Sequence, residues 1–72
     1  MNIEMLTLWL IGKTKIQIEN RIFDVLEMIS GAEQRAFWSL HYYSLDMHDM
    51  WKTRLVVYKN ACKILESTLH KL

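Results

Sequence analysis

Two histidines and two aspartates lie close together near the middle of the chain, and side chains of these types are common metal ligands. They are His41, Asp46, His48 and Asp49. In a helix, His41 and His48 lie two turns apart, about 10 Å at 1.5 Å per residue, which is too far for one zinc ion. Asp46 and Asp49 point to other sides of such a helix. The spacing therefore favours a solvated polar stripe, and we expect no metal and no cofactor.

The other reactive side chains form no catalytic group either. Arg35 and His41 have a spacing that resembles the Arg-His motif of the HEPN ribonucleases, but on a helix they lie about 120° apart, so we interpret them as a surface pair. Cys62 falls among apolar residues at helical spacing, which is typical of a buried small side chain. The sequence has no phosphate-binding glycine loop and no metalloprotease motif. We therefore expect a protein that is not an enzyme.

The chain is short for its apolar content. Its 72 residues form a single domain spanning residues 1–72, and 51% of them are hydrophobic. A chain of this length buries only about 60% of the surface that it exposes when unfolded. A single cysteine rules out an internal disulfide that would staple the fold. We expect part of the apolar surface to be covered by another chain, either a different protein or a second copy.

Charge and hydropathy narrow the classes of partner. The formal net charge is +1, with the charges dispersed along the sequence, so a nucleic-acid partner is not favoured. The most apolar run, Met5 to Ile11, is far shorter than the roughly 20 residues that span a bilayer. The lack of a disulfide fits a reducing compartment. We expect a cytoplasmic protein without a membrane span.

Two capping boxes divide the chain into three segments. Thr14 with Gln17 and Ser30 with Glu33 each have the spacing typical of a helix start. They predict helices over residues 15–29 and 32–70, with a turn at Gly31, while residues 3–11 fit either a helix or a strand. A break of the long helix near residues 44–49 is the alternative, since Ser44 or Asp46 could cap a new helix. The fold class is all-α, a helical hairpin of two or three helices with a long C-terminal helix, completed by a partner chain or by dimerisation.

A seam of apolar residues predicts how the helices pack. On the long helix it follows alternating spacings of three and four residues, and it faces an apolar stripe on the preceding helix. The seam and stripe consist of Ile18, Ile22, Val25, Ile29, Phe37, Leu40, Met47, Trp51, Leu55 and Tyr58.

A second group of apolar residues lies off this seam and is the candidate partner surface. It consists of Trp38, Tyr42 and Leu45, with Met50 and Val57. Trp and Tyr are the residues that most often anchor protein interfaces. Two interpretations remain open: the segment 3–11 covers these side chains, or a partner protein binds them.

The stretch around Gly31 resembles a known family. Gly31, Ala32, Gln34 and Trp38, followed later by Ala61, Leu65 and Glu66, resemble the pattern of the small co-chaperones of type III secretion needle subunits. The resemblance implies a bacterial, non-enzymatic helical hairpin. Such a protein binds a tetratricopeptide-like chaperone and, together with it, keeps the needle subunit soluble in the cytoplasm.

The alternative function is a small homodimeric regulator or inhibitor, encoded by a phage or plasmid, that binds a host protein. The seam of the long helix would then form the contact between two copies.

Overall fold

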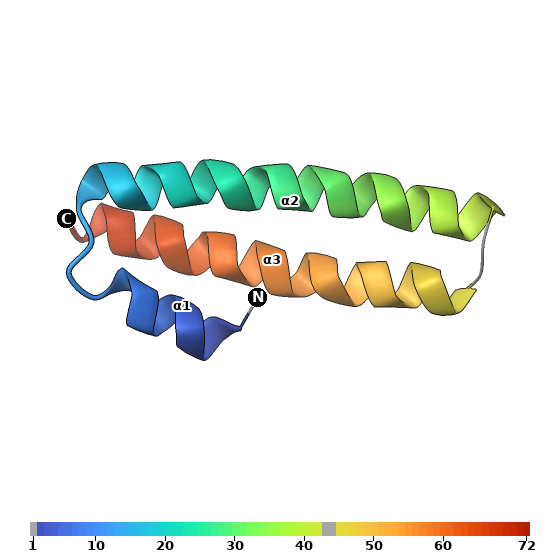
Figure 1. Cartoon of the computed structure of the whole chain (residues 1–72), viewed down its shortest axis with the longest axis horizontal. Coiled ribbons are helices and arrows are strands. Elements are labelled where there is room, and N and C mark those ends of the chain that lie inside the picture. Colours follow the sequence, from blue (N-terminus) through green and yellow to red (C-terminus); the bar gives the residue numbers. More distant parts are fainter. Residues whose placement is uncertain (1, 43–44) are drawn as a thin grey trace.

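Two long helices run antiparallel along each other and a short third helix packs against one end of the pair. The computed structural model describes residues 2–42 and 45–72, without the side chain of Tyr42. The helices are α1 (Ile3–Leu10), α2 (Lys15–Tyr42) and α3 (Leu45–His70), and the described residues include no strand. Figure 1 shows α2 and α3 side by side over their whole length. The expected all-α helical hairpin is confirmed.

The first helix begins and ends with clear local signals. The Asn2 side chain accepts a hydrogen bond of 2.8 Å from the backbone N–H of Glu4, which caps α1. After α1, Gly12 adopts a φ of 72°, a conformation that favours glycine. The ambiguity over residues 3–11 is thus resolved in favour of a helix.

The capping box at Thr14 is present and starts α2. The Gln17 N–H donates to Thr14 Oγ1 at 3.3 Å, and the Thr14 N–H donates to Gln17 Oε1 at 2.9 Å. These reciprocal bonds satisfy two backbone donors that a helix start leaves free. The sequence prediction of a helix start at this position is confirmed.

The predicted boundary at Ser30 and Gly31 is wrong. α2 continues through both residues to Tyr42, and α3 begins at Leu45, so the continuous helix over 32–70 is not formed. The alternative, a break near residues 44–49, agrees with the start of α3 at Leu45, although Asp46 lies in the first turn of α3 and the suggested cap Ser44 is outside the described residues. The reason lies in the core spacing, because the stripe of α2 continues without a change of period. It reads Ile18, Ile22, Val25, Ile29, Ala32, Ala36 and Ser39.

The main core lies at the end of the hairpin where α1 packs. The buried side chains come from all three helices, and partly buried neighbours surround them. The buried members are Leu6, Ile18, Val25, Ala61, Cys62 and Leu65, and the partly buried ones include Ile22, Ile29 and Tyr58. Trp51 and Leu55 are also partly buried. The predicted seam therefore holds on α2 up to Ile29 and on α3 from Trp51 onward.

At the other end of the hairpin the predicted seam is wrong. Phe37 and Leu40 are 57% and 51% exposed, and Met47 is 41% exposed. The neighbouring Ala36 and Ser39 are buried in their place. His48 of α3 lies against this part of α2, with its Nδ1 2.8 Å from the Ala36 carbonyl oxygen, and small residues on α2 leave room for such a contact.

Candidate functional site

An open groove runs along one side of the hairpin, between α2 and α3. One hollow of it, about 340 Å³ in volume, is lined by Arg35, Trp38, Ser39, Met47 and Trp51. A neighbouring hollow adds Met28 and Arg54 and shares Arg35 and Trp51 with the first. We call this surface the aromatic groove and define it by Met28, Arg35, Trp38, Met47, Trp51 and Arg54.

Two arginines flank the Trp51 ring in this groove. The guanidinium carbon of Arg35 lies 5.0 Å from the ring centroid, and that of Arg54 lies 4.8 Å from it. Both distances are within the range of cation–π attraction. Arg35 comes from α2 and Arg54 from α3, so each of the two long helices contributes one cation to the Trp51 ring. The groove thus combines apolar side chains with two positive charges.

Two hydrogen bonds lie beneath the groove, one within α2 and one between α3 and α2. The Ser39 hydroxyl, 2% exposed, donates to the Arg35 carbonyl at 2.6 Å. On α3, His48 Nδ1 lies 2.8 Å from the Ala36 carbonyl oxygen. Since a carbonyl only accepts, this nitrogen carries the proton. This contact links α3 to α2 directly and positions Met47 and Trp51 at the groove.

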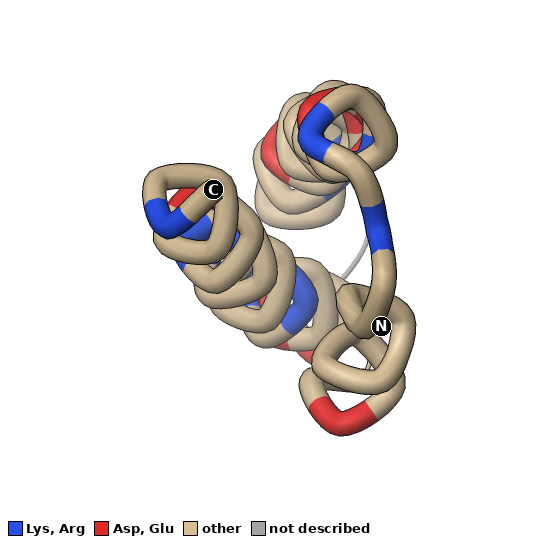
Figure 2. Tube along the Cα trace, turned by 90° about the vertical axis from the view of Figure 1, so that its left-hand side faces the viewer, with Lys and Arg blue, Asp and Glu red and all other residues tan. Residues whose placement is uncertain are grey.

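The short first helix covers only part of this side of the hairpin. α1 has 8 residues and α2 has 28, or about 12 Å against about 42 Å in length. A third hollow, beside Met5, Leu6 and Trp9, also includes Met28, so it joins the aromatic groove. Figures 1 and 2 show α1 on one side of the hairpin, with the N-terminus near the middle of its length. The aromatic groove continues the line of α1 toward the α2–α3 connection.

Three of the five predicted partner-binding residues lie in the aromatic groove or on the face of α3 that borders it. Trp38, 49% exposed, lines the groove, and Met50, 41% exposed, lies on the face of α3 that carries Met47 and Arg54. Val57 lines a hollow beside Arg54. Leu45 is exposed but lies on a different face of α3. The side chain of Tyr42 is outside the described residues.

The suggestion that residues 3–11 cover Trp38 and Leu45 is wrong. α1 packs through Leu6 against Ile18 and Val25 of α2, far along the helix from Trp38. Trp38 stays half exposed and Leu45 is 68% exposed. Their apolar surface is therefore open in the folded monomer.

The side chains that could take part in catalysis or metal binding lie apart from one another. Among the described residues, no group of three or more His, Cys, Asp or Glu side chains is placed to hold a metal ion. His41 packs against the Phe37 ring at 4.5 Å between centroids, whereas Arg35 lies over Trp51. The Arg35–His41 pair is thus split between two surfaces.

Cys62 is buried against the core. It is 8% exposed, and its Sγ donates a weak hydrogen bond to Glu66 Oε1 at 3.5 Å. Burial, followed by this hydrogen bond and the negative charge of Glu66, raises the pKa of the thiol above its ordinary value of 9.0. The thiol is therefore protonated at neutral pH and is a poor nucleophile.

Comparison with known proteins gave no match among family models, curated proteins or solved structures. No helix within residues 2–42 and 45–72 is both long enough and apolar enough to cross a membrane. The functional argument therefore rests on the surfaces of the hairpin.

Sequence reasoning missed three members of the groove, Met28, Arg35 and Arg54. Arginine beside tryptophan on a helix gives no distinct sequence signal, because a surface arginine is the ordinary case. The spacing of Trp51 and Arg54 by three residues does place them on one helical face. Arg35 joins them only through the contact between α2 and α3.

Proposed function

We propose that this protein is a non-enzymatic interaction module that binds an amphipathic helix of a partner protein in the aromatic groove. The observation that carries the proposal is the Trp51 ring, with Arg35 and Arg54 both over it, in a groove that α1 leaves uncovered. Tryptophan and arginine dominate the binding energy of many interfaces. A helix laid in such a groove uses apolar anchors spaced by three, four and seven residues.

The groove also indicates the chemistry of that partner helix. Trp38, Met47 and Trp51 offer apolar contact, and methionine adapts to differently shaped side chains. Arg35 and Arg54 place two positive charges at the same surface. A partner helix with an apolar stripe and one or two carboxylates beside it complements both features. Its binding should weaken as salt concentration rises.

The co-chaperone function is a particular form of this proposal. It names a tetratricopeptide-like chaperone in a bacterial cytoplasm as the partner, and a needle subunit as the protein kept soluble. The hairpin and its open groove support an interaction of this kind. The turn at Gly31 does not contribute support, because Gly31 lies inside α2.

The proposal predicts that groove variants lose partner binding while the fold is kept. We expect Trp38→Ala combined with Met47→Ala to reduce the affinity for the partner on the order of a hundredfold, since central apolar anchors carry about 2 kcal/mol or more. Both side chains are more than 40% exposed, so helicity by circular dichroism should not change. The measurement is co-purification of the tagged chain with its partner from the native host, followed by titration.

Val56→Ala is the matched control. Val56 is 60% exposed on another face of α3, and this variant should bind as the wild type does. Equal binding by the groove variant and the control would discard the groove as the partner site.

A further inference from the structure

A second apolar surface runs along α2 on the side away from the aromatic groove. Met28, which lines the groove, lies about 160° around the helix from Leu26. Phe23 and Phe37 are 65% and 57% exposed, and Leu26 and Leu40 are 45% and 51% exposed. We call this surface the α2 stripe and define it by Phe23, Leu26, Ser30, Glu33, Phe37 and Leu40.

The spacing of the α2 stripe is that of a coiled-coil seam. Its residues follow one another at intervals of three, four, three, four and three, so they stay in line over the length of α2. Each member directly follows a residue of the stripe that faces α3, such as Val25 before Leu26 or Ala36 before Phe37. α2 therefore carries two parallel seams, of which one is used within the hairpin and the other is open.

We propose that the α2 stripe pairs with the α2 stripe of a second copy of this chain, in antiparallel orientation about a two-fold axis near Gly31. In antiparallel pairing, Phe23 faces Leu40 of the second copy and Leu26 faces its Phe37. Every exposed apolar residue of the stripe then meets an apolar residue, and a large ring meets a smaller side chain. A two-fold axis requires this self-complementarity.

The polar residues of the stripe favour the same orientation. Antiparallel pairing places Ser30 opposite Glu33 of the second copy, so that a hydroxyl can donate to a carboxylate. Parallel pairing would place Glu33 opposite Glu33 of the second copy, with like charges at the centre of an apolar contact. The charge pattern therefore selects the antiparallel dimer over the parallel one.

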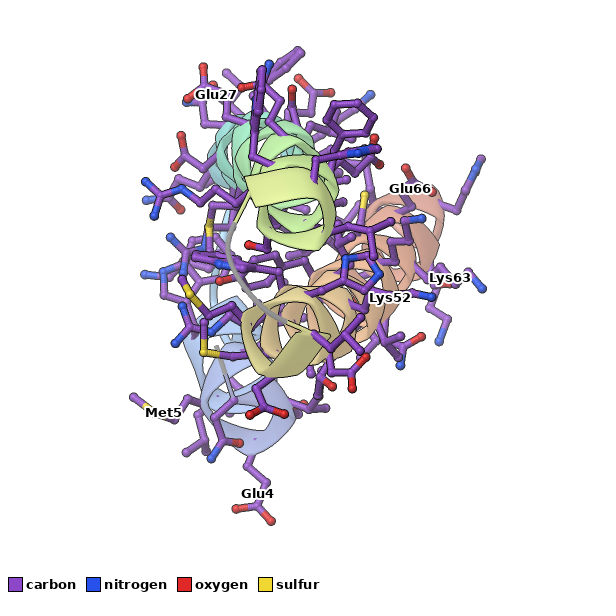
Figure 3. All side chains as sticks on the ribbon, turned by 90° about the vertical axis from the view of Figure 1, so that its right-hand side faces the viewer. Glu4, Met5, Glu27, Lys52, Lys63 and Glu66 are labelled. Carbon is purple, nitrogen blue, oxygen red and sulfur yellow. The ribbon has the colours of Figure 1, made fainter. Side chains whose placement is uncertain are left out.

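A lysine of α3 can neutralise the central carboxylates. The contact of His48 with the Ala36 carbonyl sets the register of the two helices. One turn further along α3, Lys52 comes level with the turn of α2 that carries Glu33. Figure 3 shows Lys52, Lys63 and Glu66 on one side of the hairpin and Met5 of α1 on the other. Lys52 thus lies on the open side, near the proposed axis.

The first test is the mass of the purified chain in solution. Light scattering on size-exclusion fractions should give about twice 8.7 kDa for the wild type. Phe37→Glu should weaken the dimer on the order of a hundredfold or more, because it buries an unpaired charge in each copy. Leu8→Glu is the matched control, since Leu8 is 68% exposed on α1 and the variant should stay dimeric. A wild type that is monomeric up to its solubility limit overturns the proposal.

The second test determines orientation and does not depend on the folding of Phe37→Glu. Ser30→Cys and Glu33→Cys are prepared separately in a Cys62→Ala background and then oxidised alone or mixed. Antiparallel pairing predicts that the mixture gives disulfide-linked dimers of one chain of each kind. Parallel pairing gives instead a cross-linked dimer of Ser30→Cys with itself, and this result, or no cross-link in any sample, would overturn the proposed orientation.

Discussion

Single side chains in this protein take their roles from tertiary contacts as much as from their type. Trp51 belongs to the apolar seam in sequence, yet Arg35 and Arg54 on its ring make it part of a binding surface. Sequence spacing correctly places Ile18 and Val25 in the core, because the helical period of apolar residues is enough to identify the buried face of this part of α2. It misplaces Phe37, because Phe37 and the buried Ala36 are neighbours in sequence and the contact of α2 with α3 decides which of them is buried.

The buried thiol of Cys62 gives a prediction at this scale. Alkylation by iodoacetamide at pH 8 should be slower in the folded chain than in urea, by on the order of tenfold or more, because the thiol is buried and its pKa is raised. The stabilising contribution of the protonated thiol is present below pH 9.0 and is lost as the pH rises further. Loss of stability above that pH should be smaller in Cys62→Ala. Equal alkylation rates in the folded and unfolded chain would contradict the burial.

The helices differ in how far local sequence determines their ends. The start of α2 is predicted correctly because Thr14 and Gln17 bond to each other's backbone. The same pattern at Ser30 and Glu33 has no such effect, since the buried stripe continues through Ala32 and Ala36. Local capping signals mark where a helix can start, whereas burial along the whole stripe decides where it runs. The candidate surface was predictable in part, because Trp38 was found, whereas the two arginines over the Trp51 ring were not.

Alanine substitutions at the two glycines test whether α2 runs through Gly31, with Gly12 as the comparison. Gly31→Ala should stabilise the fold by about 0.5–1 kcal/mol, because the site is helical and an added Cβ meets nothing within 4 Å. Gly12→Ala should destabilise it by roughly 1–2 kcal/mol, because its φ of 72° is unfavourable for a side chain. Urea unfolding followed by circular dichroism measures both. If Gly31→Ala were as destabilising as Gly12→Ala, α2 would end near Ser30.

At the scale of the whole molecule, the hairpin presents two separate surfaces. The aromatic groove lies on the side of α1, and the α2 stripe lies on the opposite side. A chain this short leaves both exposed because one short helix cannot cover a hairpin of this length. Dimerisation through the stripe would leave the groove of each copy open to a partner. The two proposals can therefore be tested, and can fail, independently.

Site-specific photo-crosslinking in the native host tests the central claim, that the aromatic groove holds a partner helix, most directly. A photoreactive phenylalanine analogue is placed at Met47 in the groove or, as a control, at Lys63 on another face of α3. We expect the Met47 probe to cross-link one protein, through a helical segment with an apolar stripe and adjacent carboxylates, and the Lys63 probe to leave that protein unlabelled. The same product from both positions, or none from Met47, would contradict the account.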